Sequence, residues 1–219
     1  MEALNPIYFF QGHLFARGYV CHPTLRKLLL ATTLAPIFME KSGQLLEHGL
    51  ALFATSDPPH LGPEKRPGTL AAEEIENQLR TATEPEIMDA FKLTFALVLL
   101  WHDHLNQAHT IAQDIPSSDG SYLHGIMHRR EPDYENAKYW FRRVGTHPIF
   151  DELGTQVSSV AQAHPSRVIR SGEWDPIAFV DLCAALATKK DSAREQAARH
   201  LQAMEFHFLL RHFCGGKRS

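Results

Sequence analysis

Histidines gather in one stretch of this chain. Five of the 14 lie between His102 and His128, and the carboxylates Asp103 and Glu131 stand close to members of this group. A neutral imidazole binds transition metals through a ring nitrogen, and it also accepts and donates protons near pH 7. A carboxylate beside it can fix which of its nitrogens carries the proton. These residue types therefore indicate two chemistries, metal binding and acid–base catalysis.

The first histidines of the group are predicted to lie on one long helix over 86–113, because apolar residues recur there with helical spacing. At about 100° per residue, His102, Asn106, His109 and Gln113 share one face of this helix. That face contains no Lys, Glu or Arg, which a solvent-facing stripe usually carries. We therefore expect it to be enclosed, either as buried polar groups that link helices or as a ligand or metal pocket.

His124 and His128 are four residues apart, which places both imidazoles on one face of a helix. Two zinc ligands on a helix have the same spacing, although the catalytic HExxH form is absent because Gly125 stands in place of the Glu. A short loop precedes this helix, so His109 is expected to approach His124. Three or four imidazoles together with Asp103 or Glu131 would suit a Zn, Fe or Mn ion. The alternative is a purely structural pair, and the sequence does not decide between them. The candidate metal ligands are His102, His109, His124 and His128.

A basic segment follows the second histidine pair and indicates an anion-binding surface. Guanidinium forks beside aromatic residues and histidines suit a carboxylate or phosphate. The alternative is a solvated face whose cations pair with Glu131, Asp133 and Glu135. The candidate ligand-binding residues are Asn106, Gln113, His124, Arg129, Arg130, Lys138, Arg142 and Arg143.

The elements that must position these residues are predicted to be helices. We expect an all-α single domain over 1–219, with about eight or nine helices around the long central helix over 86–113. Ser121 is expected to cap a helix over 122–130, Asp133 and Gly145 to delimit the next, and Asp175-Pro176 to begin another. The proline-rich segment over 55–69 is expected to be a surface loop.

Composition excludes several classes of protein. The formal net charge of −3, with too few basic residues outside the basic segment to form a continuous track, argues against a nucleic-acid surface. Three widely spaced cysteines argue against a disulfide framework and are typical of a reducing compartment. No secretory signal or membrane-spanning apolar run is evident. We therefore expect a soluble, cytoplasmic protein that does not bind membranes; a homo-oligomer is not excluded.

Three resemblances can be drawn from these motifs. The segment DYENAKYWFRRVG is similar to half of a tetratricopeptide or Sel1-type unit, and His102-Asp103 resembles the metal-binding pair of HD-type phosphohydrolases, without its partner residues. The stretches LWHDHLNQAHTIAQ and HGIMHRREPDYENAKYWFRRVGTHP resemble an uncharacterised family of soluble helical proteins. That family resemblance implies no activity.

The function predicted from the residues is binding of a small anionic molecule in a cleft lined by His and Arg side chains. If the protein is an enzyme, metal-assisted or histidine acid–base hydrolysis is expected. The acid–base groups would be His102, His109 and His128, with Asp103 or Glu131 orienting one of them. The alternative is a non-catalytic helical interaction module with a structural network of buried polar groups.

Overall fold

The structure is a computed structural model that describes residues 39–80, 87–160, 168–190 and 192–215. All of these residues belong to one compact unit, Pro36–Ser219. Nine helices and one two-stranded sheet make up its regular structure within the described ranges. The all-α prediction is confirmed. The helices expected before residue 39 lie outside the described residues.

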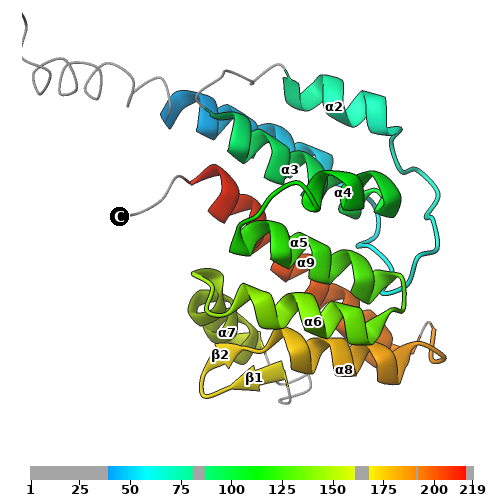
Figure 1. Cartoon of the computed structure of the whole chain (residues 1–219). Coiled ribbons are helices and arrows are strands. Elements are labelled where there is room, and N and C mark those ends of the chain that lie inside the picture. Colours follow the sequence, from blue (N-terminus) through cyan, green and yellow to red (C-terminus); the bar gives the residue numbers. More distant parts are fainter. Residues whose placement is uncertain (1–38, 81–86, 161–167, 191, 216–219) are drawn as a thin grey trace, which may run out of the picture. The chain divides into compact units, whose positions relative to one another are not determined.

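The helices follow one another in chain order and are labelled in Figure 1. A helix over 39–52 comes first. The others are α2 (Ala72–Arg80), α3 (Met88–Trp101), α4 (Leu105–Ala112), α5 (Ser118–Arg130), α6 (Tyr134–Val144), α7 (Ile149–Val160), α8 (Pro176–Leu186) and α9 (Ala193–Cys214). Strands β1 (Ile169–Arg170) and β2 (Glu173–Trp174) form an antiparallel pair between α7 and α8.

The predicted long helix over 86–113 is wrong, because the chain breaks it into α3 and α4. The break lies at residues 102–104, where Asp103 has a φ of 66°. The side chain of Asp103 accepts hydrogen bonds from Arg66 and Arg130, which hold it in this left-handed conformation. The predicted stripe is therefore divided, and His102 does not share a helical face with Asn106 and His109.

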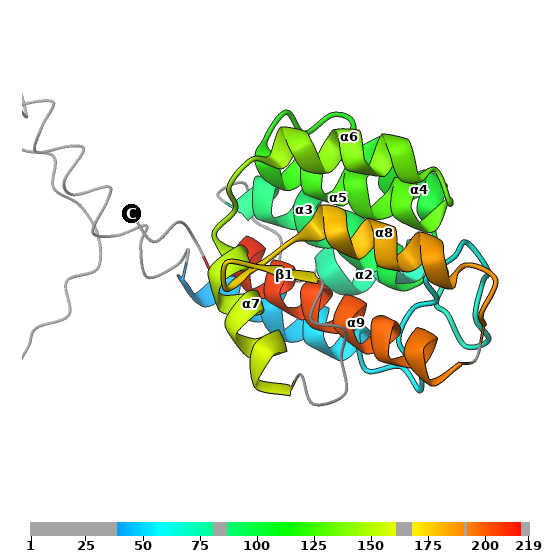
Figure 2. The same cartoon turned by 90° about the horizontal axis from the view of Figure 1, so that it is seen from below.

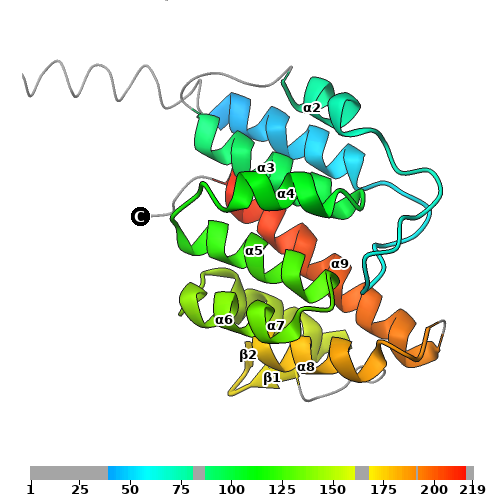
Figure 3. The same ribbon diagram turned by 45° about the vertical axis from the view of Figure 1, so that its right-hand side comes forward.

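Helix α5 is the most enclosed element, with every residue from Gly120 to Arg130 buried. It lies between α4 and α6 in the views of Figures 1 and 3. Helix α3 supplies the apolar core beside it, since Ala96 to Trp101 are all buried. Helix α9 extends past α7 and α8 (Figure 2) and also contacts α3. A helix that is buried on all sides needs a hydrogen-bond partner for each polar side chain it carries. Helix α5 carries four large polar side chains.

Local capping signals explain where several helices begin and end. Asp133 accepts from the Asn136 amide at the start of α6, and Gly145 ends this helix with a φ of 66°. Asp175 accepts from two amides at the start of α8, with Pro176 in its first turn. These predictions are confirmed. The predicted cap Ser121 is wrong: Ser117 accepts from the Gly120 amide, so α5 begins one turn earlier.

The proline-rich segment over 55–69 is a loop whose middle is anchored rather than free on the surface. Leu61 and Arg66 are buried. Arg130 of α5 donates hydrogen bonds to the carbonyl groups of His60 and Gly62. The segment therefore packs against the helices and is fixed there by these contacts. Among the described helices, none combines the length and apolar character needed to cross a membrane.

Candidate metal centre

Three of the four predicted metal ligands lie together. His109 comes from α4, and His124 and His128 come from α5. One nitrogen from each imidazole can be chosen so that all three lie within 4.8 Å of one another. The ring centroid of His109 lies 4.6 Å from that of His124 and 5.6 Å from that of His128. The predicted approach of His109 to His124 is therefore confirmed.

Close packing between α5 and α6 positions this cluster. A Cβ atom added to Gly125 would lie 2.9 Å from the ring of Phe141, so the absence of a side chain lets the two helices approach. On the same helix as Phe141, Trp140 stacks on His124 with 3.9 Å between ring centroids and 5° between planes. The indole therefore forms one wall of the histidine cluster.

His124 is the most enclosed member of the cluster. Its residue is 4% exposed, and its Nδ1 atom is buried without a hydrogen-bond partner. Burial and the neighbouring imidazoles of His109 and His128 lower the pKa of His124 to about 4. At neutral pH this imidazole is therefore uncharged, as a metal ligand must be.

His128 has partners that define its tautomer. The Glu131 carboxylate lies 3.5 Å from Nδ1, and the Asn136 amide nitrogen lies 3.1 Å from Nε2. The same Asn136 nitrogen also lies 3.4 Å from Nδ1, so it is the Glu131 carboxylate that favours the proton on Nδ1, which leaves a lone pair on Nε2. Burial lowers the pKa of His128 despite the opposing charges of Glu131 and Asp133. Glu131 therefore lies beside the imidazole of His128, and an orienting role for it stays a prediction.

His102 lies apart from the cluster and is bonded through both ring nitrogens. Its Nε2 lies 2.8 Å from the Leu52 carbonyl oxygen, and its Nδ1 accepts from the Leu70 amide at 3.2 Å. The ring therefore joins the end of the helix over 39–52 to the loop before α2. His104 makes a similar contact to the Leu70 carbonyl.

The predicted site residues Asp103, Arg129 and Arg130 belong to buried ion pairs. Asp103 bridges Arg66 and Arg130 at 3.0 and 2.7 Å. Burial would raise the pKa of the Asp103 carboxyl, but Arg130 and Arg66 outweigh it and hold this pKa below its ordinary value. Arg129 pairs with Glu205 at 2.6 Å, and neither side chain is exposed. The charges of these arginines are therefore paired within the protein, although Nε of Arg129 is buried without a hydrogen-bond partner.

The remaining predicted ligand-binding residues lie nearer the surface. Lys138 pairs with Asp181 and Glu135, as the alternative interpretation of the basic segment expected for a solvated face. Asn106, Gln113 and Arg142 are exposed. Arg143 is also exposed, and its guanidinium carbon lies 5.2 Å from the centroid of Trp140. Arg143 is therefore a cation beside the wall of the histidine cluster.

A second cluster was missed by the sequence analysis. His147 and His212 both approach the Oδ1 atom of Asp119 through Nε2, at 2.8 and 3.0 Å. His147 also accepts from the Ile149 amide through Nδ1, at 3.4 Å. That bond leaves the proton of His147 on Nε2, where it is donated to Asp119. This nitrogen has no lone pair for a metal, so the second cluster is better explained as a hydrogen-bonded junction of α5 and α9.

Only long-range packing unites the three residues of this second cluster. His212 lies 93 residues from Asp119, and no spacing in the sequence joins them. Among the described residues, the first cluster thus remains the better candidate for metal binding. When the chain is compared with protein-family models, with curated proteins and with solved structures, nothing matches.

Proposed function

We propose that this protein binds a divalent transition-metal ion, with Zn²⁺ as the first choice, through His109, His124 and His128. The observation that carries the proposal is the convergence of three imidazole nitrogens within 4.8 Å of one another. Zn–N bonds of about 2.0–2.1 Å in a tetrahedral site require ligand nitrogens about 3.4 Å apart. Rotations of the imidazoles that move their ring nitrogens by about an ångström would bring the nitrogens to this spacing. Fe and Mn are the other ions that such a site could hold.

Two details favour a metal site over a structural network. A structural network satisfies its buried polar atoms, whereas Nδ1 of His124 has no partner. Metal-bound histidines commonly donate their second nitrogen to a carboxylate, and Glu131 occupies that position beside Nδ1 of His128. The amide nitrogen of Asn136 now faces the Nε2 lone pair of His128. In the proposed site the metal ion would replace this amide nitrogen at the lone pair.

The proposed reaction class is metal-assisted hydrolysis of a small anionic molecule. The three histidines would hold the ion and leave it open to a further ligand, and the ion would supply the Lewis-acid chemistry that activates water for hydrolysis. His109 is half-buried, so the cluster is accessible from its side of α4. Arg143, exposed beside Trp140, is the cation that would attract the substrate. The free, buried thiols of Cys183 and Cys214 fit a reducing compartment, and we place the protein in the cytoplasm.

Metal analysis of the purified protein tests the proposal, supported by absorption spectra of the Co²⁺-loaded form. We expect one equivalent of metal per chain and the intense visible bands of tetrahedral cobalt. His109→Ala should reduce metal affinity at least 100-fold, because it removes one of the three ligands. The variant should still fold, because this half-buried side chain can be removed with little loss of packing. The matched control is His200→Ala, an exposed histidine on α9. Equal affinities of the two variants would refute the assignment.

A further inference from the structure

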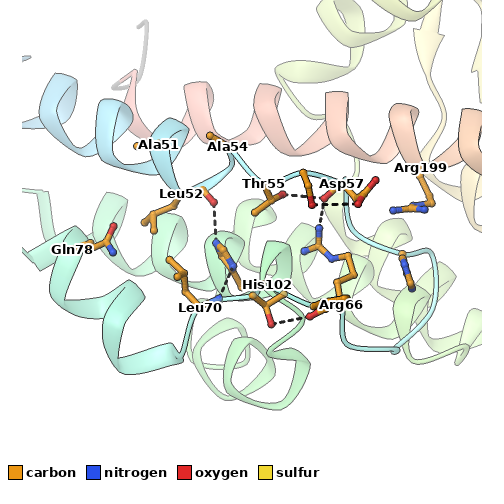
Figure 4. A pocket seen from close by; sticks show the side chains of 15 residues that line it. Ala51, Leu52, Ala54, Thr55, Asp57, Arg66, Leu70, Gln78, His102 and Arg199 are labelled. Atoms are coloured by element: carbon orange, nitrogen blue, oxygen red, sulfur yellow. Dashed lines mark hydrogen bonds between the residues drawn. The ribbon is translucent and has the colours of Figure 1, made fainter.

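A cavity of about 550 Å³ lies away from the histidine cluster, between the end of the helix over 39–52 and the loop before α2. Figure 4 shows His102 in its middle, with Gln78 and Arg199 at opposite ends of the lining. Small-molecule sites in proteins commonly have volumes of about 300–1,000 Å³. The cavity therefore has the size of a binding site for a small molecule.

Two arginines line the cavity, and Arg66 is already neutralised. Its backbone amide and its Nε both donate to Asp103, at 2.9 and 3.0 Å. Its terminal nitrogens donate to the carbonyl oxygens of Asp57 and Trp101. Arg66 thus holds the wall of the cavity together, and little of its charge is left for a ligand.

Arg199 is different, because no carboxylate pairs with it among the described residues. One terminal nitrogen donates to the Pro58 carbonyl at 2.6 Å, and its Nε is buried without a partner. Glu195, one turn earlier on α9, does not form an ion pair with it. The other terminal nitrogen has no hydrogen bond to a described residue, and an oxyanion in the cavity would pair with this end of the guanidinium.

The electrostatics of His60, which also lines the cavity, agree with this assignment. Burial and then the positive charge of Arg199 lower the pKa of His60, against the smaller opposing effects of Asp103 and Glu195. Arg199 is therefore the strongest single charge acting on the His60 imidazole. The neutral imidazole of His60 makes no hydrogen bond to any described residue, so it too is available to a ligand.

Asp57 adds a second requirement. Its exposed carboxylate lines the same cavity as Arg199 (Figure 4), where it accepts from the Ser56 hydroxyl at 3.3 Å. An anion bound to Arg199 would be repelled by this carboxylate unless the ligand also presented a donor to it. Apolar side chains of Leu52 and Leu70 cover another part of the lining.

We propose that this cavity binds a small organic anion whose carboxylate or phosphate pairs with Arg199 and whose hydroxyl or amino group donates to Asp57. The site is independent of the histidine cluster, so each can fail without the other. Carboxylate and phosphate ligands of this kind share one chemistry, which is an oxyanion next to a hydrogen-bond donor.

Titrations followed by NMR at the Nε–H group of Arg199 test this directly in the full chain. The probes are malate and glycerol 3-phosphate, each with an acid group and a hydroxyl, and succinate, which is malate without the hydroxyl. We expect saturable shifts at Arg199 with malate, glycerol 3-phosphate or both, and at least threefold weaker binding of succinate than of malate. The probe that binds distinguishes the carboxylate from the phosphate.

Variants separate the site from general attraction of anions. Arg199→Gln should weaken binding at least tenfold, whereas Arg194→Gln, an exposed arginine on the same helix, should leave it unchanged. Asp57→Asn should abolish the preference for malate over succinate. The absence of a saturable shift at Arg199 in the wild-type protein, or equal shifts at Arg194, would overturn the proposal, and this readout does not depend on any variant folding.

Discussion

The imidazole of His124 lies flat on the indole of Trp140, with ring centroids 3.9 Å apart. This contact joins a residue of α5 to a residue of α6 and fixes the plane of the most buried histidine in the cluster. Because the ring plane determines where the nitrogen lone pairs point, Trp140 helps to set the geometry in which an ion would be held.

Replacing Trp140 tests this positioning role. We expect Trp140→Ala to lower metal affinity about 10–100-fold, in the range seen when groups that orient metal ligands are removed. Trp140→Phe should retain most of the affinity, because a phenyl ring can stack in the same place. Competition with a chromophoric chelator measures both values. Equal losses in the two variants would argue that flat stacking on His124 is irrelevant.

The carboxylate beside His128 leads to a second prediction. Glu131→Gln should lower metal affinity about 10–100-fold, because it weakens the interaction that keeps the proton on Nδ1 of His128. Folding stability should change by less than about 1 kcal/mol, since Glu131 is exposed. Chelator competition and thermal unfolding provide the two readouts. The control is Glu152→Gln, an exposed glutamate on α7, and an equal effect there would exclude a specific role.

The buried ion pair between Arg129 and Glu205 leads to a prediction about stability. Arg129→Met should reduce the free energy of unfolding by about 3–5 kcal/mol, because it leaves Glu205 charged and buried. Tyr122, which donates to Glu205 at 3.0 Å, cannot replace the lost charge. Changing both residues to apolar ones should destabilise the protein less than the single change does. Chemical denaturation measures each value; additive losses would contradict the account.

His102 leads to a prediction about pH. Burial is the largest cause that lowers its pKa below 6.5, ahead of the opposing bond to Leu52. The unfolded chain therefore takes up this proton first as the pH falls, so the stabilisation is complete above pH 6.5 and is lost below it. His102→Gln should be less stable at pH 7 by about 1–3 kcal/mol. It should also lose less stability than the wild type between pH 7 and pH 5.

Thermal unfolding across this pH range checks the prediction for His102. The same slope in the variant and the wild type would show that His102 does not contribute to the acid sensitivity. Such a result would also contradict the neutral, doubly bonded state that its contacts to Leu52 and Leu70 indicate.

Elements with strong local signals were predictable from the sequence. The cap at Asp133 and the left-handed Gly145 delimit α6 within eleven residues, and Asp175-Pro176 begins α8. The pairing of His124 with His128 also follows from helical spacing alone. In each case the residues that decide the structure are a few positions apart.

The break between α3 and α4 could not be predicted in this way. Asp103 adopts a positive φ because of Arg66 and Arg130, which lie 37 and 27 residues away. Local apolar spacing favours one continuous helix there, and tertiary contacts override it. The same reason explains why His102 was assigned to the candidate site: its partners Leu52 and Leu70 are 50 and 32 residues distant.

The most direct test of the proposed metal centre is X-ray absorption spectroscopy at the zinc edge on protein loaded with one equivalent of Zn²⁺. The account predicts a four-coordinate ion with three imidazole nitrogens at about 2.0 Å and one further light atom, and the loss of one imidazole in His109→Ala. A spectrum with fewer than three imidazoles, or one that His109→Ala leaves unchanged, would contradict it.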